Sequence, residues 1–276
     1  MVNLDRRLTR PGAVIAFADS GGGGLPVVFT HGAGMDHSMF DAQADALSRQ
    51  GFRVIIWDIR GHGASALSGG VRFLGRDALD DLAALLAACG DTAPVLVGHS
   101  LGGNLVQAFA REHPDRVGAA VVLDSTWNAG PLTRMERVAL RLAAPLLSAI
   151  PAARLPRLMA RASAVTPEAI SRAEAVFARM PKSRFVDVWR ATASFVDPDP
   201  DRRFPAPLAL LRGAEDATGN IATAMPRWAA VEAVAEHVIP NAGHIVTWDA
   251  ADAVTRALLR ILDGWRDELT ESAGRS

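Results

Sequence analysis

The chain has 276 residues, of which 49% are hydrophobic and 21% charged, with a formal net charge of −1 at pH 7. This balance does not support a nucleic-acid partner or a stable, charge-driven membrane association, so we expect a small-molecule substrate and one globular unit, monomeric or homodimeric. Cys89 is the single cysteine, which excludes an internal disulfide, and no run of residues has the pattern of a signal peptide or a membrane span. We therefore expect a cytoplasmic protein.

Short apolar runs alternate with helical patterns in the first part of the chain. Strands are predicted over 14–18, 26–30, 52–57, 95–97 and 117–123, with helices over 77–89 and 101–112. The alternation returns after residue 205, with strands over 208–211 and 237–240 and helices over 222–235 and 250–266. This order predicts an α/β fold with a mostly parallel central sheet, helices on both faces, and a site at the carboxyl ends of the strands.

Between residues 126 and 205 the alternation stops and helical patterns follow one another. Prolines are expected to separate these helices, at Pro131, Pro145, Pro151, Pro156, Pro167 and Pro181. We interpret 126–205 as a helical cap inserted into a core formed by 1–125 and 206–276. The alternative is an independent second domain, which the return to strands after 205 disfavours.

Residues 95–103 read Val-Leu-Val-Gly-His-Ser-Leu-Gly-Gly, an apolar run that ends in a Gly-x-Ser-x-Gly turn. The turn from strand to helix in such a motif is tight and strained, and small residues at Gly98 and Gly102 meet that need. The motif predicts Ser100 as a catalytic nucleophile. Because glycine and serine are common, this motif alone is weak evidence for a catalytic serine. The other segments of the chain must support the assignment.

A serine nucleophile needs a base within hydrogen-bond reach and an acid that orients the base. His244 follows a predicted strand and precedes a helix, which makes it the best base among the seven histidines. Asp216 follows the strand over 208–211 and is our choice of acid. Glu215, its neighbour, and Asp124, directly after the strand over 117–123, remain alternatives.

The oxyanion of an acyl-transfer intermediate needs two backbone N–H donors. Leu101 follows the nucleophile at the start of a helix, and Ala33 lies in a turn of small residues after the strand over 26–30. Apolar residues that flank these loops are candidates for the substrate pocket, namely Met35, Phe40, Trp127 and Trp248.

No cofactor or metal site is expected. The glycine cluster over 20–24 precedes a strand and lacks the Lys-Ser/Thr ending of a phosphate-binding loop. The histidines are scattered along the chain, and one cysteine cannot build a thiolate site.

These segments together resemble the α/β-hydrolase fold family, in its single-domain, cap-bearing form. The order Ser100, Asp216, His244 matches the family order, as do His31-Gly32, the segment Asp58-Ile-Arg-Gly-His-Gly-Ala-Ser65, the serine turn and Gly243-His244. The resemblance implies a Ser-His-Asp hydrolase in which residues 58–65, with His62 among them, have a structural role near the site. His99, before the serine, receives no chemical role.

Differences from other enzymes of this fold narrow the range of reactions that we expect. Epoxide hydrolases and haloalkane dehalogenases carry aspartate in place of the serine, and the epoxide enzymes also use cap tyrosines, whereas this chain has serine and no tyrosine. We expect cleavage of a carboxylic ester or related acyl bond of a largely apolar substrate. Alternatives are cleavage of a carbon–carbon bond or lactone with the same triad, a non-catalytic binder on the same scaffold, and a lipase with residues 138–160 as a lid.

Overall fold

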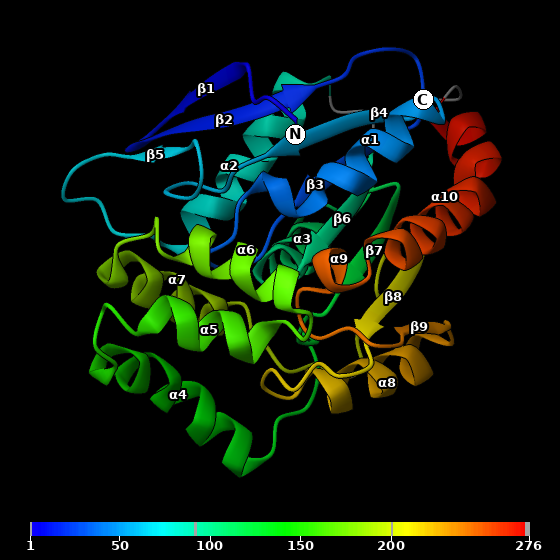
Figure 1. The fold of residues 1–276 in the computed structure, drawn as a ribbon. Coiled ribbons are helices and arrows are strands. Elements are labelled where there is room, and N and C mark those ends of the chain that lie inside the picture. The colour runs from blue at the N-terminus through cyan, green and yellow to red at the C-terminus, as the bar shows by residue number, and fades with distance from the viewer. Residues whose placement is uncertain (1, 91–92, 200, 274–276) are drawn as a thin grey trace.

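The computed structural model describes residues 2–90, 93–199 and 201–273, which fold around one nine-stranded sheet (Figure 1). The strand order is β1-β2-β4-β3-β6-β7-β8-β9, with the short β5 paired to β2. Pairing is parallel from β4 through β9 and antiparallel among β1, β2, β4 and β5. The strands are β1 Arg6–Arg10, β2 Ala13–Asp19, β3 Pro26–Thr30, β4 Arg53–Trp57, β5 Ala66–Leu67, β6 Val95–His99, β7 Ala119–Leu123, β8 Leu208–Gly213 and β9 Glu236–Ile239.

Helices cover both faces of this sheet, as the sequence predicts. The α-helices outside the segment between β7 and β8 are α1 Asp41–Arg49, α2 Gly75–Ala88, α3 Leu101–Glu112, α8 Ile221–Glu232, α9 Val246–Asp249 and α10 Ala251–Ala273, and two 3-10 helices are η1 His37–Phe40 and η2 Pro114–Arg116. Alternate residues of the central strands point to opposite faces, as in Val95 and Val97 on one side and Leu96 on the other. One hydrophobic cluster joins these strands to α2, α3 and α8, and the other joins them to α1 and α10. Both faces of the sheet are therefore buried, which explains its apolar strands.

Among the described residues, four helices lie between β7 and β8, and Figure 1 places them together beyond the carboxyl ends of the central strands. They are α4 Arg134–Ala149, α5 Leu155–Ser163, α6 Pro167–Phe177 and α7 Lys182–Ser194. Pro156 and Pro167 lie in the first turns of α5 and α6, where the missing N–H has no helical partner to lose. The expectation that Pro145 separates two helices is wrong, because it lies inside α4.

Several elements were not predicted from the sequence, among them β1, β5 and α1. The edge strand β1 exposes most of its residues and lacks an apolar face, β5 has only two residues, and α1 has few apolar positions. The segment 138–160 is not one amphipathic helix, because α4 ends at Ala149 and α5 begins at Leu155. In the described part of the chain, no helix is both long and apolar enough to cross a membrane.

Candidate active site

Ser100 lies in the tight turn that joins β6 to α3. Its backbone has φ 52° and ψ −116°, a left-handed conformation that non-glycine residues rarely adopt. The neighbouring glycines permit this turn because a Cβ on Gly98 would lie 2.5 Å from the Gly102 carbonyl oxygen, and one on Gly102 would lie 2.0 Å from the Thr30 oxygen. The backbone of α3 therefore approaches the sheet closely only because both residues are glycine.

Ser100, His244 and Asp216 form one line of hydrogen bonds. The Ser100 hydroxyl lies 3.0 Å from His244 Nε2, and His244 Nδ1 lies 2.9 Å from Asp216 Oδ2. The three residues come from the β6–α3 turn, the loop after β9 and the loop after β8, so the parallel sheet brings them to one edge. With the ring neutral, Nδ1 donates to Asp216 and Nε2 accepts from Ser100, the tautomer that a base for a serine hydroxyl requires.

The environment of Asp216 holds it as a carboxylate. Burial by itself would raise its pKa, but the charge and hydrogen bond of His244, with hydrogen bonds from Thr218, lower the pKa of Asp216 to about 2. The Thr218 amide donates to Asp216 Oδ1 at 2.8 Å, so each carboxylate oxygen has a donor. Sequence reasoning did not identify Thr218, which follows Asp216 by two residues in a turn that lets its amide reach back to the carboxylate.

Asp124 is close to this line but outside it. Its side chain is fully buried, and its Oδ1 accepts the Gly213 amide at 2.8 Å. One carboxylate oxygen of Asp124, one of Asp216 and one ring nitrogen of His244 lie within 4.8 Å of one another. Burial and then the charge of Asp216 raise the pKa of Asp124 well above its ordinary value, so its surroundings favour the neutral carboxylic acid over the carboxylate. Glu215, the other alternative acid, is exposed.

The turn over residues 31–34 packs directly against the nucleophile. A Cβ on Gly32 would lie 2.6 Å from His99 Nδ1 and 3.3 Å from Ser100 Cβ. Among the described residues the Ala33 amide has no acceptor, and Leu101 begins α3, where the N–H groups lack helical partners. Both N–H groups are therefore free to donate hydrogen bonds to an oxyanion beside Ser100.

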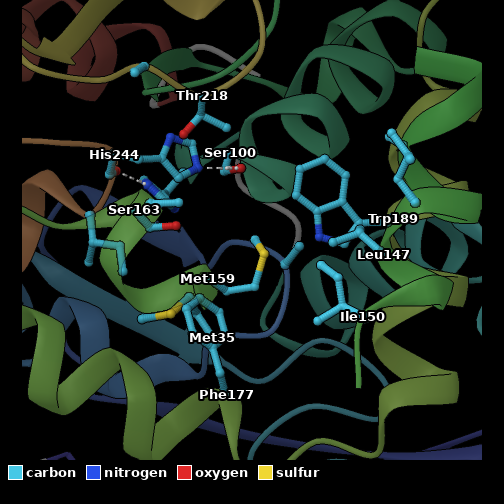
Figure 2. A pocket seen from close by; sticks show the side chains of 17 residues that line it. Met35, Ser100, Leu147, Ile150, Met159, Ser163, Phe177, Trp189, Thr218 and His244 are labelled. Carbon is cyan, nitrogen blue, oxygen red and sulfur yellow. Dashed lines mark hydrogen bonds between the residues drawn. The ribbon is translucent and has the colours of Figure 1, made fainter. Parts of the chain in front are cut away.

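A cavity of about 340 Å³ opens in front of Ser100 (Figure 2). Its lining joins the sheet edge to helices α4–α7, and in the described part of the chain no Asp, Glu, Arg or Lys side chain contributes to it. In Figure 2, Met35, Met159 and Phe177 lie across the cavity from Ser100 and His244, while Trp189 stands with Leu147 and Ile150 at one side. The liners are Ala33, Met35, His99, Ser100, Ala143, Leu146, Leu147, Ile150, Met159, Ala162, Ser163, Phe177, Trp189, Ala217, Thr218, His244 and Ile245.

Of the four side chains that we expected in this pocket, Met35 lines it, and the expectation for the other three is wrong. Phe40 is fully buried and packs on Phe29, with ring centroids 4.9 Å apart. Trp127 stacks on Trp228 beside a different cavity. Trp248 lies under the Arg172 guanidinium, 4.2 Å from its ring centre. The liners from α4–α7 escaped prediction because no sequence signal says which side of a helix faces a pocket formed by distant loops.

The loop that carries His244 is fixed by hydrogen bonds to α5 and α6. The Ile245 amide donates to the Ser163 carbonyl at 2.8 Å, and Asp249 accepts from the amides of Gly243 and Thr166. His99 donates from Nε2 to the His244 carbonyl oxygen at 2.6 Å. The position of His244 therefore depends on both the sheet and the inserted helices, and His99 has a positioning contact that the sequence did not reveal.

The segment 58–65 is hydrogen-bonded to the turn that packs against Ser100. Asp58 is fully buried and accepts hydrogen bonds from the amides of His37 and Ala64, while the Ile59 amide donates to His31 Nε2 at 2.9 Å. His62 is buried, with its Nδ1 on the Arg60 carbonyl oxygen at 3.1 Å. These contacts link the turn over 31–34 to the β4 side of the sheet, and His62 does not reach the line formed by Ser100, His244 and Asp216.

Comparisons with known proteins agree with this architecture. The structure of a thermophilic esterase from Thermogutta terrifontis is 28% identical, with a TM-score of 0.79 over 95% of this chain and 99% of that one. A bifunctional esterase/perhydrolase from Acinetobacter calcoaceticus is 35% identical over 119 residues, and a non-heme haloperoxidase from Rhodococcus erythropolis is 39% identical over 103 residues.

These two alignments cover 42% and 37% of this chain, and 43% and 37% of the respective relatives. The names of the relatives support an enzyme, with hydrolases and esterases among them. The family model described as alpha/beta hydrolase fold matches residues 26–251, which is most of the chain. The chain therefore belongs to the alpha/beta hydrolase fold family.

Proposed function

We propose that the protein is a serine hydrolase that cleaves carboxylic esters of small, uncharged, largely apolar substrates. The hydrogen-bonded line from Ser100 through His244 to Asp216 carries this proposal, since it supplies nucleophile, base and orienting acid at distances of 3.0 and 2.9 Å. Similarity to esterases supports the same reaction class.

In the first half of the reaction, the Ser100 oxygen attacks the ester carbonyl carbon and His244 Nε2 takes the hydroxyl proton. The carbonyl π electrons move to the oxygen, and the Ala33 and Leu101 amides stabilise the resulting oxyanion. Collapse of the tetrahedral intermediate expels the alcohol, which receives the proton from His244. An acyl group then remains on Ser100.

In the second half, His244 takes a proton from a water molecule, which attacks the acyl carbon. The new tetrahedral intermediate expels the Ser100 oxygen, and His244 returns the proton to it. Asp216 stays ionised throughout and holds the ring in its working orientation, which agrees with the low pKa that His244 and Thr218 give it.

The substrate preference follows from the cavity. Its volume of about 340 Å³ suits a small ligand, and its apolar lining without Asp, Glu, Arg or Lys among the described residues would leave a charged substituent without a partner. Helices α4–α7 act as the cap that supplies one wall of this acyl site. A butyryl ester should therefore react much better than the equally long succinyl ester, which ends in a carboxylate.

The test is turnover of p-nitrophenyl acetate, butyrate and octanoate by the wild type, Ser100→Ala and His244→Ala. Turnover should fall by at least about 10³-fold in both variants, because the nucleophile and its base act as a unit. Labelling of the wild type by a fluorophosphonate, absent in Ser100→Ala, identifies the nucleophile directly. Turnover that persists in both variants would refute the assignment.

A further inference from the structure

The outward side of α4 exposes a row of large apolar side chains. Met135, Val138, Leu142 and Leu146 are 84%, 54%, 49% and 64% exposed. At about 100° per residue they fall within a stripe roughly 80° wide, so they form one continuous ridge along the helix. Leu158, on α5, is a further large apolar side chain that is 49% exposed.

The opposite side of α4 faces the protein. Ala144 is its one buried residue, and Ala143 and Leu147 line the cavity in front of Ser100. Figure 1 shows α4 at the rim of the molecule, far from the sheet and with no element outside it. The apolar ridge therefore has no covering partner in the described part of the chain.

Positive charge is concentrated in the segment that carries this ridge. Residues 134–163 contain six arginines and one glutamate, a net charge of +5 in a chain whose total is −1. All six arginines are exposed, and within the described residues none of them has an ion-pair partner. The glutamate, Glu136, accepts hydrogen bonds from the Thr133 amide and the Asn220 side chain. The arginines are Arg134, Arg137, Arg141, Arg154, Arg157 and Arg161.

The ridge is continuous with the mouth of the cavity. Leu146 belongs to both, since it is 64% exposed and also lines the cavity. Met159 and Ala162 of α5 lie in the same lining. An acyl chain held at the outer surface of α4 would thus meet an apolar path from Leu146 toward Ser100.

We propose that this outer surface of α4 and α5 adsorbs reversibly to an anionic lipid–water interface. An amphipathic helix with apolar side chains on one side and arginines beside them lies in the plane of such an interface, with the arginines at the negatively charged headgroups. The outer surface of a helix is convex, and Met135 is 84% exposed on it. A deformable lipid surface matches this shape better than a folded acidic protein, which would have to provide a groove along the helix.

Adsorption needs no hydrolase chemistry, whereas delivery of a lipid-borne ester to Ser100 rests on the proposed function. The two ideas can fail separately. Binding to vesicles tests the first without any substrate, and Ser100→Ala should bind them as well as the wild type does.

Co-sedimentation with phosphatidylcholine vesicles, with and without phosphatidylglycerol, tests the proposal. The wild type should partition at least about tenfold more strongly onto the anionic vesicles, and added salt should weaken this binding. Arg137→Gln/Arg141→Gln and, separately, Met135→Gln/Leu142→Gln should each lower the partition about tenfold. Neither pair lines the cavity, so turnover of dissolved p-nitrophenyl butyrate should stay unchanged.

A matched control is available on α10, where Arg256 and Arg260 are exposed at the same spacing as Arg137 and Arg141. Arg256→Gln/Arg260→Gln removes the same charge elsewhere and should sediment like the wild type. Equal binding to both kinds of vesicle, or equal loss in the control, would overturn the proposal. So would tight binding of the α4–α5 surface to an acidic protein together with no binding to vesicles.

Discussion

Two buried carboxyl groups stand next to each other at the site, and their surroundings separate their roles. Asp216 accepts from His244 and Thr218. Within the described residues, Asp124 accepts only the Gly213 amide, and its Oδ2 has no partner other than the nearby Asp216. Two carboxylates at this distance cannot both stay ionised in a buried site. Of the two, Asp124 is therefore the one whose surroundings favour the protonated form, whereas Asp216 favours the charged form beside His244.

Substitution of each aspartate by asparagine should distinguish these roles. Asp216→Asn removes the charge that orients His244, and turnover of p-nitrophenyl butyrate should fall by on the order of 10³ to 10⁴-fold. Asp124→Asn replaces a neutral acid by a neutral amide of similar shape, and turnover should stay within about threefold of the wild type. The reverse order of effects would make Asp124 the orienting acid.

At the scale of single elements, the serine turn depends on how closely α3 approaches the sheet. Gly102 lies in the first turn of α3 with its Cα facing the Thr30 carbonyl, so a methyl group there meets backbone that cannot move independently. Gly264 offers a contrast, because it lies inside α10 with open space around the position of a Cβ. The same substitution should therefore have opposite effects in these two helices.

Gly102→Ala should lower the free energy of unfolding by about 3 kcal/mol or more, since overpacking against backbone forces α3 away from β3. Gly264→Ala should raise it by about 0.5–1 kcal/mol, because alanine loses less conformational freedom in a helix than glycine does. Urea denaturation followed by circular dichroism measures both. A stable Gly102→Ala variant with full activity would contradict the close-approach explanation.

At the scale of the whole molecule, the sequence predicts the sheet better than the pocket. The central strands are continuous apolar runs because both faces of the sheet are buried, and the serine turn, Asp216 and His244 follow strands whose ends must meet at one edge. The edge strand β1 reads Arg-Arg-Leu-Thr-Arg and carries no such signal. The pocket wall depends on how α4–α7 settle over the loops, and apolar Trp127 and Phe40 pack elsewhere although they flank the same loops.

Net charge does not reveal the local concentration of arginines in residues 134–163. A total of −1 includes a segment, residues 134–163, with a net charge of +5, because acidic residues elsewhere in the chain compensate for its six arginines. Composition averages over the chain, whereas an interface responds only to the charges within about a Debye length of it. The position of α4 at the rim, and not its composition alone, makes this segment a distinct surface.

The stability of the whole molecule should depend on pH through two buried groups, His62 and Asp124, whose pKa shifts have opposite effects on acidification. Burial lowers the pKa of His62 to about 3, so the folded state keeps this ring neutral while the unfolded chain takes up a proton near pH 6.5. This histidine therefore makes the protein less stable as the pH falls from about 6.5 toward 3. The raised pKa of Asp124, due to burial and Asp216, acts the other way, because the folded state holds a proton that the unfolded chain releases above about pH 3.8.

Two variants should accordingly change the pH dependence in opposite directions between about pH 6 and 4.5. His62→Asn keeps a donor for the Arg60 carbonyl oxygen and removes the titrating ring, so stability should fall less steeply on acidification, by about 1.4 kcal/mol per pH unit. Asp124→Asn removes a group that favours the folded state on acidification, because its pKa is raised in the folded protein, so stability should fall more steeply than in the wild type. The free energy of unfolding from urea titrations at several pH values gives both slopes. Equal slopes in the wild type and the Asp124 variant would mean that Asp124 is ionised in the folded protein, and the separation of roles between the two carboxyl groups would then be wrong.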